Sequence, residues 1–400
     1  MLAAGAICVG AAFPLGERDL LRVGALLVVL PLIAAATVAR TRFRIACLRS
    51  LHPARVPAGS QAQVDLLIRN DARLPSTLLL LEDQVPYALG SRPRFVIDRL
   101  ESGGSRRVSY RASTTLRGRY QIGPLAIRLT DPFGCVELGH EFASYEDLIV
   151  TPATTPLPQL ALRSHQRSSG EQSASVLAAV GEIDVGTRAY RHGDDLRKVH
   201  WRSTARTGEL MVRQEQAGHT SRVGVILDTR QAAHRGDSVT GSFEWAVSAA
   251  ASVVVHLARR ELVVDLMDGG KPLHSSGLGA TLVQSLLLDR LAVIEVGQRP
   301  TLAGDIMRAR SRANECGELF VILGALGNED IHGLVPLAAS VPAAHALLLD
   351  VASWSTDPDP TLRAQLRTAE RRLRAASWRV AVVARGDRLE DAWLRLGAVR

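Results

Sequence analysis

The pattern of hydrophobic and polar positions changes twice along the chain. Residues 1–40 are almost continuously apolar, residues 51–156 alternate apolar and polar positions in short runs, and residues 215–400 alternate short apolar runs with longer amphipathic ones. A long apolar stretch favours a membrane span, period-two alternation favours half-buried strands, and strands interleaved with helices favour a mainly parallel sheet. The chain is therefore predicted to be a multidomain protein with three differently built parts.

The apolar N-terminus predicts a transmembrane helical hairpin over residues 1–44. Residues 23–39 carry no charge and would span roughly 25 Å as a helix at about 1.5 Å per residue, close to the hydrocarbon thickness of a bilayer. Residues 1–15 are also apolar, and only Gly16-Glu17-Arg18-Asp19 separates the two segments. The alternative is a cleaved signal peptide, but Arg18, the first positive charge, follows the apolar segment, whereas signal peptides carry this charge in front of it.

Positive charges just after the hairpin predict which side of the membrane the rest of the chain occupies. Four arginines follow the second apolar segment, namely Arg40, Arg42, Arg44 and Arg49. Flanks rich in Lys and Arg stay on the cytoplasmic side. The bulk of the chain is therefore expected in the cytoplasm, held at the cell (inner) membrane.

Residues 45–156 are predicted to form a small antiparallel β-sandwich, immunoglobulin-like in outline. Turn residues such as Asn70-Asp71 and Ser102-Gly103-Gly104 separate short alternating runs, and this spacing is typical of sandwiches. Residues 157–185, rich in Thr, Pro, Ser, Gln and Gly, would follow as a linker. The predicted strands cover residues 63–68, 77–81, 106–111, 119–122, 125–129 and 148–151.

Residues 215–400 are predicted to form a doubly wound α/β domain. Continuous apolar strands separated by amphipathic helices imply a parallel sheet that is covered on both faces. Asp228 and Asp350 would end two strands at the carboxyl edge, where such sheets bind ligands. The predicted strands cover residues 223–227, 262–267, 319–323, 344–349 and 379–383, and the predicted helices cover residues 243–259, 281–291, 301–312, 331–339 and 362–375.

Between these domains, residues 186–214 mix Arg, Asp, His and Trp more densely than any other stretch. Asp194 is expected to cap a short helix that reaches Val199, because its carboxylate accepts the free amide hydrogens of a first turn. Val199 and Trp201 would give this helix an apolar side. Residues 209–214 would follow a tight turn as a half-buried strand.

This motif resembles the signature of a bacterial family, the domain of unknown function 58. The resemblance is carried by Tyr190-Arg191-x-Gly193-Asp194-Asp195-x-Arg197-x-x-x-Trp201, followed by Ala205-Arg206 and Gly208-Glu209-Leu210. Two upstream runs, Arg117-Gly118-Arg119-Tyr120-x-x-Gly123-Pro124 and Asp131-Pro132-Phe133-Gly134, resemble an earlier part of the same family, and their Gly and Pro are expected to serve turn geometry. The residues expected to form the binding or structural motif are Tyr190, Arg191, Gly193, Asp194, Asp195, Arg197, Trp201 and Arg206.

The family resemblance also implies a context for the protein. It implies a C-terminal domain like that of von Willebrand factor A. It further implies the company of a MoxR-type AAA+ ATPase and a transglutaminase-like membrane protein, and through them a role in envelope or complex assembly. The family has no settled reaction, so the resemblance implies partners without implying catalysis.

Domains of the von Willebrand factor A type bind a divalent cation through Asp-x-Ser-x-Ser after the first strand, because carboxylate and hydroxyl oxygens suit a hard cation. Here the corresponding run reads Asp228-Thr229-Arg230-Gln231-Ala232. A guanidinium at the first serine position would repel the metal. The adhesion-type site is therefore predicted to be absent, with Asp228 and Thr229 left as a degenerate remnant that could bind metal weakly.

Two alternatives to an interaction protein are a hydrolase and a metal-dependent adhesion module. Asp194, Asp195 and His200 could serve a hydrolase, because paired carboxylates and histidine are common general acids and bases. Nearby arginines would instead hold both aspartates ionised, which suits an arginine–aspartate lattice packed around Trp201 better than proton transfer. No catalytic residue is therefore assigned. These arginines are Arg188, Arg191, Arg197, Arg202 and Arg206.

Net charge and cysteine spacing indicate which kinds of partner and cofactor the chain could bind. The chain has 48 Lys and Arg against 40 Asp and Glu, a net charge of +8, but the arginines are dispersed and form no basic block with interleaved aromatics. This favours a membrane surface over nucleic acid. The four cysteines have no zinc-type spacing, and no cofactor is predicted. The sequence predicts a membrane-anchored cytoplasmic interaction or scaffold protein that is not an enzyme.

Overall fold

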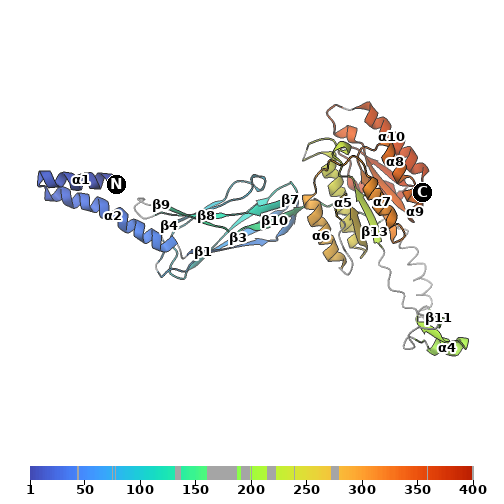
Figure 1. Ribbon diagram of the computed structural model, residues 1–400, viewed down its shortest axis with the longest axis horizontal. Helices are drawn as coiled ribbons and strands as arrows, with labels where there is room; N and C mark the ends of the chain where they lie inside the picture. The colour runs from blue at the N-terminus through green and yellow to red at the C-terminus, as the bar shows by residue number, and fades with distance from the viewer. Residues whose placement is uncertain are drawn as a thin grey trace. The chain divides into compact units, whose positions relative to one another are not determined.

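The computed structural model describes most of the chain, and it divides into two compact units, Met1–Ala153 and Thr154–Arg400 (Figure 1). The described residues are 1–42, 45–73, 75–76, 78–130, 137–159, 187–190, 199, 201–213, 222–237, 239–271, 279–357 and 359–398.

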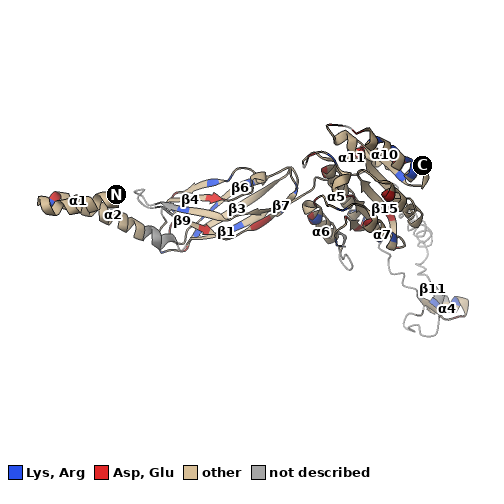
Figure 2. Cartoon of the chain, turned by 45° about the horizontal axis from the view of Figure 1, so that its top comes forward, with Lys and Arg blue, Asp and Glu red and all other residues tan. Residues whose placement is uncertain are grey.

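Two apolar helices open the first unit, α1 (Leu2–Leu15) and α2 (Arg18–Arg42). The stretch of α2 from Arg18 to Ala36 is long and apolar enough to cross a membrane, whereas α1 is shorter. Large apolar side chains on both helices point outward, among them Ile7, Phe13 and Leu26, each more than 60% exposed. Charged side chains gather at the turn between the helices (Figure 2), and residues 23–39 of α2 carry no charge. This exposure is unlike that of a buried core helix.

The two helices pack closely because glycines lie between them. A Cβ atom on Gly24 would lie 2.8 Å from the backbone nitrogen of Val9, and one on Gly5 would lie 3.0 Å from the carbonyl oxygen of Gly24. Small residues at such contacts let two helix backbones approach, as in helix pairs within membranes. The predicted helical hairpin is therefore present as a packed pair.

Among the described residues of the first unit, ten strands form three sheets, ordered β1-β3-β6, β2-β10-β7 and β5-β4-β8-β9. All pairings are antiparallel except that of β2 with β10, which is parallel. The strands are β1 (Ile45–His52), β2 (Arg55–Pro57), β3 (Gln61–Asn70), β4 (Leu78–Asp83), β5 (Arg94–Ile97), β6 (Ser105–Ser113), β7 (Gly118–Ile122), β8 (Leu125–Thr130), β9 (Glu137–Phe142) and β10 (Glu146–Thr151).

Strand β3 shows why these sheets form two layers. Its alternate residues Ala62, Val64, Leu66 and Ile68 are fully buried, as period-two alternation requires. The first two belong to a core shared with β2-β10-β7, and the last two to a core shared with β5-β4-β8-β9. One face of β1-β3-β6 therefore covers both other sheets. The six predicted strands are present, whereas β1, β2, β5 and β9 were not predicted.

The second unit is built on a parallel five-stranded sheet ordered β14-β13-β15-β16-β17. Its strands are β13 (Arg222–Leu227), β14 (Val263–Met267), β15 (Cys316–Leu323), β16 (Ala344–Leu349) and β17 (Arg379–Val383). Its helices are α5 (Ser242–Ala258), α6 (Ala280–Val293), α7 (Ala303–Ser311), α8 (Asn328–Leu334), α9 (Leu337–Ser340), α10 (Pro360–Ala375) and α11 (Leu389–Ala398), with short 3-10 turns η3 (Gln231–Ala233) and η4 (Val351–Trp354).

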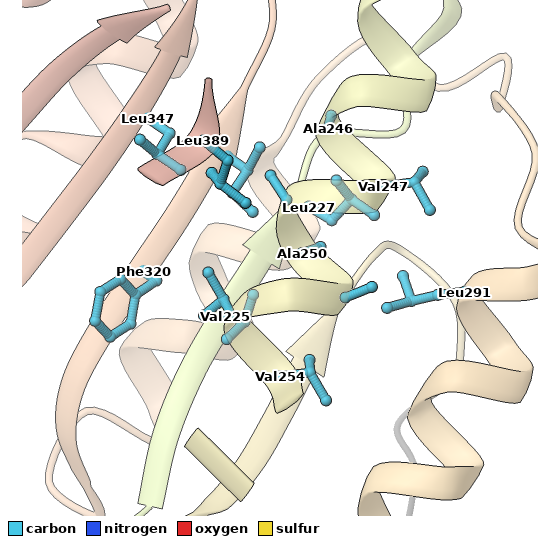
Figure 3. Packing of buried hydrophobic residues seen from close by; sticks show 14 of the residues in the cluster. Val225, Leu227, Ala246, Val247, Ala250, Val254, Leu291, Phe320, Leu347 and Leu389 are labelled. Atoms are coloured by element: carbon cyan, nitrogen blue, oxygen red, sulfur yellow. The ribbon is translucent and has the colours of Figure 1, made fainter. Parts of the chain in front are cut away.

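Helices cover both faces of this sheet, as predicted. Val225 and Leu227 of β13 pack with α5, α6 and α11, while Ile226 packs on the opposite face with α7, α8, α9 and α10. Figure 3 shows the first of these cores, where Ala246, Ala250 and other small side chains of α5 lie over β13. Because both faces of the strands are buried, their sequences read as continuous apolar runs.

Three details of the second unit differ from the predictions. The single helix expected over residues 331–339 is two helices, α8 and α9, with Pro336 between them, because proline lacks the N–H that a continuous helix requires. Helix α11 was not predicted. Residues 154–158, predicted to end the sandwich and start the linker, pack on the α/β domain: the Thr155 N–H donates to Ser252 Oγ (2.9 Å) and Trp393 Nε1 donates to the Pro158 carbonyl (2.9 Å).

Candidate functional site

The family-like motif folds partly as a small hairpin. Strand β11 (Thr187–Ala189) pairs antiparallel with β12 (Met211–Arg213), and the Tyr190 N–H donates to the Leu210 carbonyl over 2.7 Å. Helix α4 (Trp201–Thr207) lies between the two strands in sequence, with Arg206 in its last turn. The other expected motif residues lie outside the described part of the chain: Arg191, Gly193, Asp194, Asp195 and Arg197, together with His200 of the hydrolase alternative.

Three expectations about this hairpin are wrong. Val199 forms a β-bridge with Val212 and so does not belong to a helix. Trp201 is 71% exposed, so it is not the packed centre of a lattice, whereas Val199 and Val212 are buried. Side chains two apart share a face only along a strand, and the backbone becomes helical at Trp201, so it turns away from Val199. Leu210 is likewise exposed, outside the strand that was expected to half-bury it.

The carboxyl edge of the α/β sheet carries a cluster of buried polar side chains. In chain order the strands lie 2-1-3-4-5, and such sheets bind ligands where the order reverses, here between β13 and β15. Strand β13 runs directly into Asp228, Thr229 and Arg230 at this point. The side chains of Asp228, Arg230 and Asp330 are almost fully buried.

Arg230 joins two aspartates that are about a hundred positions apart in the sequence. Its Nε and Nη2 lie 2.9 and 2.8 Å from the two carboxylate oxygens of Asp228, and its Nη1 lies 2.7 Å from Oδ2 of Asp330. Nη2 also donates to the Ala325 carbonyl, which follows β15. Asp330, in the first turn of α8, accepts the N–H groups of Gly327 and Leu302. The guanidinium therefore ties together the loops after β13 and β15 and the start of α8.

The carboxylate of Asp228 has no acceptor position left. Oδ1 accepts from the backbone N–H and the Nε of Arg230, and Oδ2 accepts from Nη2 of Arg230 and the N–H of Gly324. An ionised carboxylate has about four lone-pair positions, so these four donors fill it. Burial alone would lower the pKa of Arg230, but the hydrogen bonds and charges of Asp228 and Asp330 outweigh burial and raise it. Arg230 is therefore cationic.

Thr229, the second residue of the expected degenerate metal site, forms a hydrogen bond with another arginine, Arg299. Its hydroxyl donates to the Asp268 carbonyl (3.1 Å) and accepts from Nη2 of Arg299. Arg299 also pairs with Asp305 through Nη1 (3.1 Å). The predicted positions Asp228 and Thr229 are thus adjacent as expected, yet guanidinium groups occupy the faces that a cation would use. These residues do not fit a divalent metal.

His234 supports Asp228 from the protein interior. Its Nε2 donates to the Asp228 carbonyl (2.8 Å), so its Nδ1 accepts from the Ser242 hydroxyl (3.1 Å) at the start of α5. Burial lowers the pKa of His234, which keeps the ring neutral. Beside this edge, the crevice lined by Gly324, Leu349 and Leu362 encloses about 10 Å³, room for about one water molecule. This crevice is too small for a ligand of nucleotide size.

The upstream family-like motif has a structural explanation. Tyr120 donates from its hydroxyl to the Leu116 carbonyl (2.9 Å), four residues earlier, as in the tyrosine corner of β-sandwiches. Gly123 has φ of 119° and lies where a Cβ would come 2.5 Å from the Ser144 carbonyl and 2.8 Å from Arg49 Nη1. The turn therefore requires glycine, as expected. The run at residues 131–134 lies outside the described residues.

Sequence reasoning did not find Asp330, Arg299 or Asp268 as members of the cluster. Asp330 carried one usable signal: it stands in the first helical turn after a buried strand, where acidic residues favour the helix dipole. Nothing local linked it to Arg230. The three loops meet only because parallel strands end at a common edge.

Comparison with known proteins supports the family resemblance over part of the chain. Residues 186–271, from β11 through β14, match the family described as "Protein of unknown function DUF58". The Bacillus subtilis (strain 168) "Uncharacterized protein YeaD" is 21% identical over 228 residues, 56% of this chain and 55% of that protein. The match thus spans about half the length of this relative.

Two solved structures each resemble about a quarter of the chain. The CARDB domain of the PF1109 protein from Pyrococcus furiosus has 13% identity and a TM-score of 0.20, covering 26% of this chain and 91% of that one. A chain in the complex of zinc 2-glycoprotein and prolactin inducible protein from human seminal plasma has 12% identity and a TM-score of 0.22, covering 27% and 95%. Likenesses at this level carry no argument about fold or function.

Proposed function

We propose that the chain is a membrane-anchored protein-interaction module whose α/β domain, of the von Willebrand factor A type, docks a partner protein at the carboxyl edge of its sheet. One observation carries this proposal: the four hydrogen bonds from Arg230 and Gly324 that fill the Asp228 carboxylate. An edge whose reactive groups are paired internally offers a fixed surface, and a fixed surface suits docking better than catalysis.

The strand topology supports the same proposal. A parallel sheet with Asp228 directly after the first strand, at the point where strand order reverses, is the arrangement in which von Willebrand factor A-type domains carry their binding surface. Exposed residues surround the paired core at this edge, among them Gln231, Asn328 and Glu329. A partner would contact these residues, while the buried ion pairs keep the loops in place.

The N-terminal helices support membrane attachment. The exposed apolar surface of α1 and α2 would be covered by lipid, and α2 has the length to cross a bilayer. The arginines that follow the uncharged run of residues 23–39 favour a cytoplasmic α/β domain at the cell (inner) membrane. In this setting the partners implied by the family resemblance, a MoxR-type AAA+ ATPase and a transglutaminase-like membrane protein, are the first candidates for docking.

Site-specific photocrosslinking in cells tests the docking edge. A photoreactive amino acid at exposed position Gln231 or Glu329 lies at the carboxyl edge, whereas Glu261 and Glu315, also exposed, precede β14 and β15 at the opposite edge. We expect partner adducts from the first pair and none from the second, identified by mass spectrometry after solubilising the membranes. Adducts confined to positions 261 and 315 would contradict the proposal.

A further inference from the structure

The buried triad of Asp228, Arg230 and Asp330 has the composition of a cation site in which the cation is an amino-acid side chain. Two carboxylates about a hundred residues apart, Asp228 after β13 and Asp330 in the first turn of α8, face one positive charge, and the Ala325 carbonyl also accepts from it. Mg²⁺ commonly takes one or two carboxylates, with water and carbonyl oxygens supplying the other ligands. The same oxygens here surround a guanidinium.

We propose that Arg230 is a covalently attached substitute for a divalent cation, and that its guanidinium covers a latent metal site formed by Asp228 and Asp330. The side chain holds the loops after β13 and β15 in one arrangement at every metal concentration. Removing the guanidinium would free three acceptor positions, one on each oxygen of Asp228 and one on Oδ2 of Asp330. A serine at position 230 would add a hydroxyl oxygen.

Charge explains why the site cannot simply be left empty. Without Arg230, two buried carboxylates would face each other with no counter-ion, and removing one partner of a buried ion pair is strongly destabilising. A bound divalent ion would neutralise both. The variant protein should therefore depend on metal where the natural protein does not.

The test compares full-length Arg230→Ser with the natural chain in detergent, with and without about 10 mM MgCl₂, using thermal unfolding followed by tryptophan fluorescence. All five tryptophans lie in the second unit, so the signal excludes the sandwich. We expect the melting temperature of Arg230→Ser to fall in EDTA and to rise by at least about 3 °C with MgCl₂. The melting temperature of the natural chain should change by less than about 1 °C on addition of MgCl₂.

Two controls separate a metal site from a general salt effect. Arg312→Ser frees the single buried carboxylate of Asp265 in the same sheet, 2.5 Å from Arg312 Nη1, and should lose stability without recovering in MgCl₂. Adding Asp330→Ala to Arg230→Ser should abolish the recovery. Arg230→Gln, which keeps an amide donor, is the milder variant if Arg230→Ser is poorly folded in EDTA.

Three results would overturn the proposal. The first is a folded Arg230→Ser or Arg230→Gln protein whose melting temperature does not change with Mg²⁺. The second is failure to obtain either variant folded in Mg²⁺, because the ion then cannot replace the guanidinium. The third is a Mg²⁺ response of the natural chain that Asp330→Asn removes. No partner takes part in this experiment, so its outcome is independent of the proposed docking role.

Discussion

Arg49 of β1 and Asp83 of β4 form an ion pair inside the β-sandwich, with Nη2 2.5 Å from Oδ1 and both side chains almost fully buried. The Tyr110 hydroxyl donates to the other oxygen of Asp83 (2.6 Å), and Arg49 Nη1 donates to the Ile122 carbonyl (3.3 Å). Burial and the charge of Asp83 raise the pKa of Tyr110, so the phenol stays a donor. The pair joins strands from three sheets around Gly123.

Replacing Arg49 by Met should destabilise the sandwich by about 3–5 kcal/mol, because it leaves the buried Asp83 without its counter-charge. Hydrogen–deuterium exchange of full-length protein should show the loss as faster exchange in β1 and β4. The matched control is Arg69→Met, whose pair with Asp71 is exposed to solvent and should contribute far less to stability. Equal protection in the two variants would show that the buried pair is dispensable.

Gly123→Ala should lower the stability of the sandwich by about 1–3 kcal/mol more than Gly139→Ala does. The Cβ at position 123 meets the Ser144 carbonyl at 2.5 Å with φ of 119°, whereas a Cβ at position 139 in β9 meets nothing within 4 Å. Both variants change one glycine of the same sandwich, and exchange rates of β7 and β10 compare them. A Gly123→Ala protein as stable as Gly139→Ala would show that the turn relaxes without cost.

The helix pair can be tested by a disulfide between α1 and α2. A Cβ at Gly24 would lie 3.1 Å from the Cβ of Cys8, and a small separation of the helices would bring the two within the usual disulfide range of about 3.5–4.5 Å. With the other cysteines replaced by serine, Gly24→Cys should cross-link to Cys8 on oxidation, seen by peptide mass spectrometry. Gly16→Cys in the connecting turn is the control and should stay reduced.

Mild acid should destabilise the α/β domain. Burial lowers the pKa of both His234 and His256, so the unfolded chain binds protons at a higher pH than the folded chain does. Stability is therefore complete above the unfolded histidine pKa of about 6.5 and declines as pH falls below it. Urea unfolding followed by tryptophan fluorescence at pH 7.5 and 5.5 should show this decline, and His256→Phe should make it smaller. An unchanged decline in the variant would assign the effect to other groups.

A cytoplasmic location predicts protection from external protease. Arg202 and Arg206 lie on the exposed helix α4 and offer trypsin sites. In whole cells stripped of the outer barrier, added trypsin should leave the chain intact, and detergent should then permit cleavage within α4. Cleavage at Arg206 before detergent, or recovery of the intact chain in a salt-washed soluble fraction, would contradict the proposed anchoring and its orientation.

Elements with strong local patterns were predicted well. The uncharged run of residues 23–39 falls within α2, and the apolar run of residues 223–227 falls within β13. Hydrophobic periodicity indicates whether a helix or strand is apolar on one face or all round, and this pattern is what makes such elements predictable from sequence. Strand β9 was missed because it is short and mostly polar. Helix α11 was missed although its buried residues Leu389, Ala392, Trp393 and Leu396 follow helical spacing, so the sequence did carry a signal for it.

The motif shows the limit of such reasoning. Spacing placed Val199 and Trp201 on one apolar face of a helix, but Val199 is bridged to Val212 and Trp201 faces outward. A short helix of seven residues has little stability of its own, so where it begins depends on the pairing of β11 and β12 around it. The residue types indicated a compact motif without fixing its geometry.

By itself the sequence determined the apolar N-terminus, the strand and helix pattern of the α/β domain, and a guanidinium at position 230 where a metal ligand was expected. Only the tertiary structure decided what that guanidinium does: it fills the carboxylate of Asp228 and reaches Asp330. The physical reason is that parallel strands gather their carboxyl ends at one edge, so charges far apart along the chain become neighbours in a buried space. There each charge must find a partner.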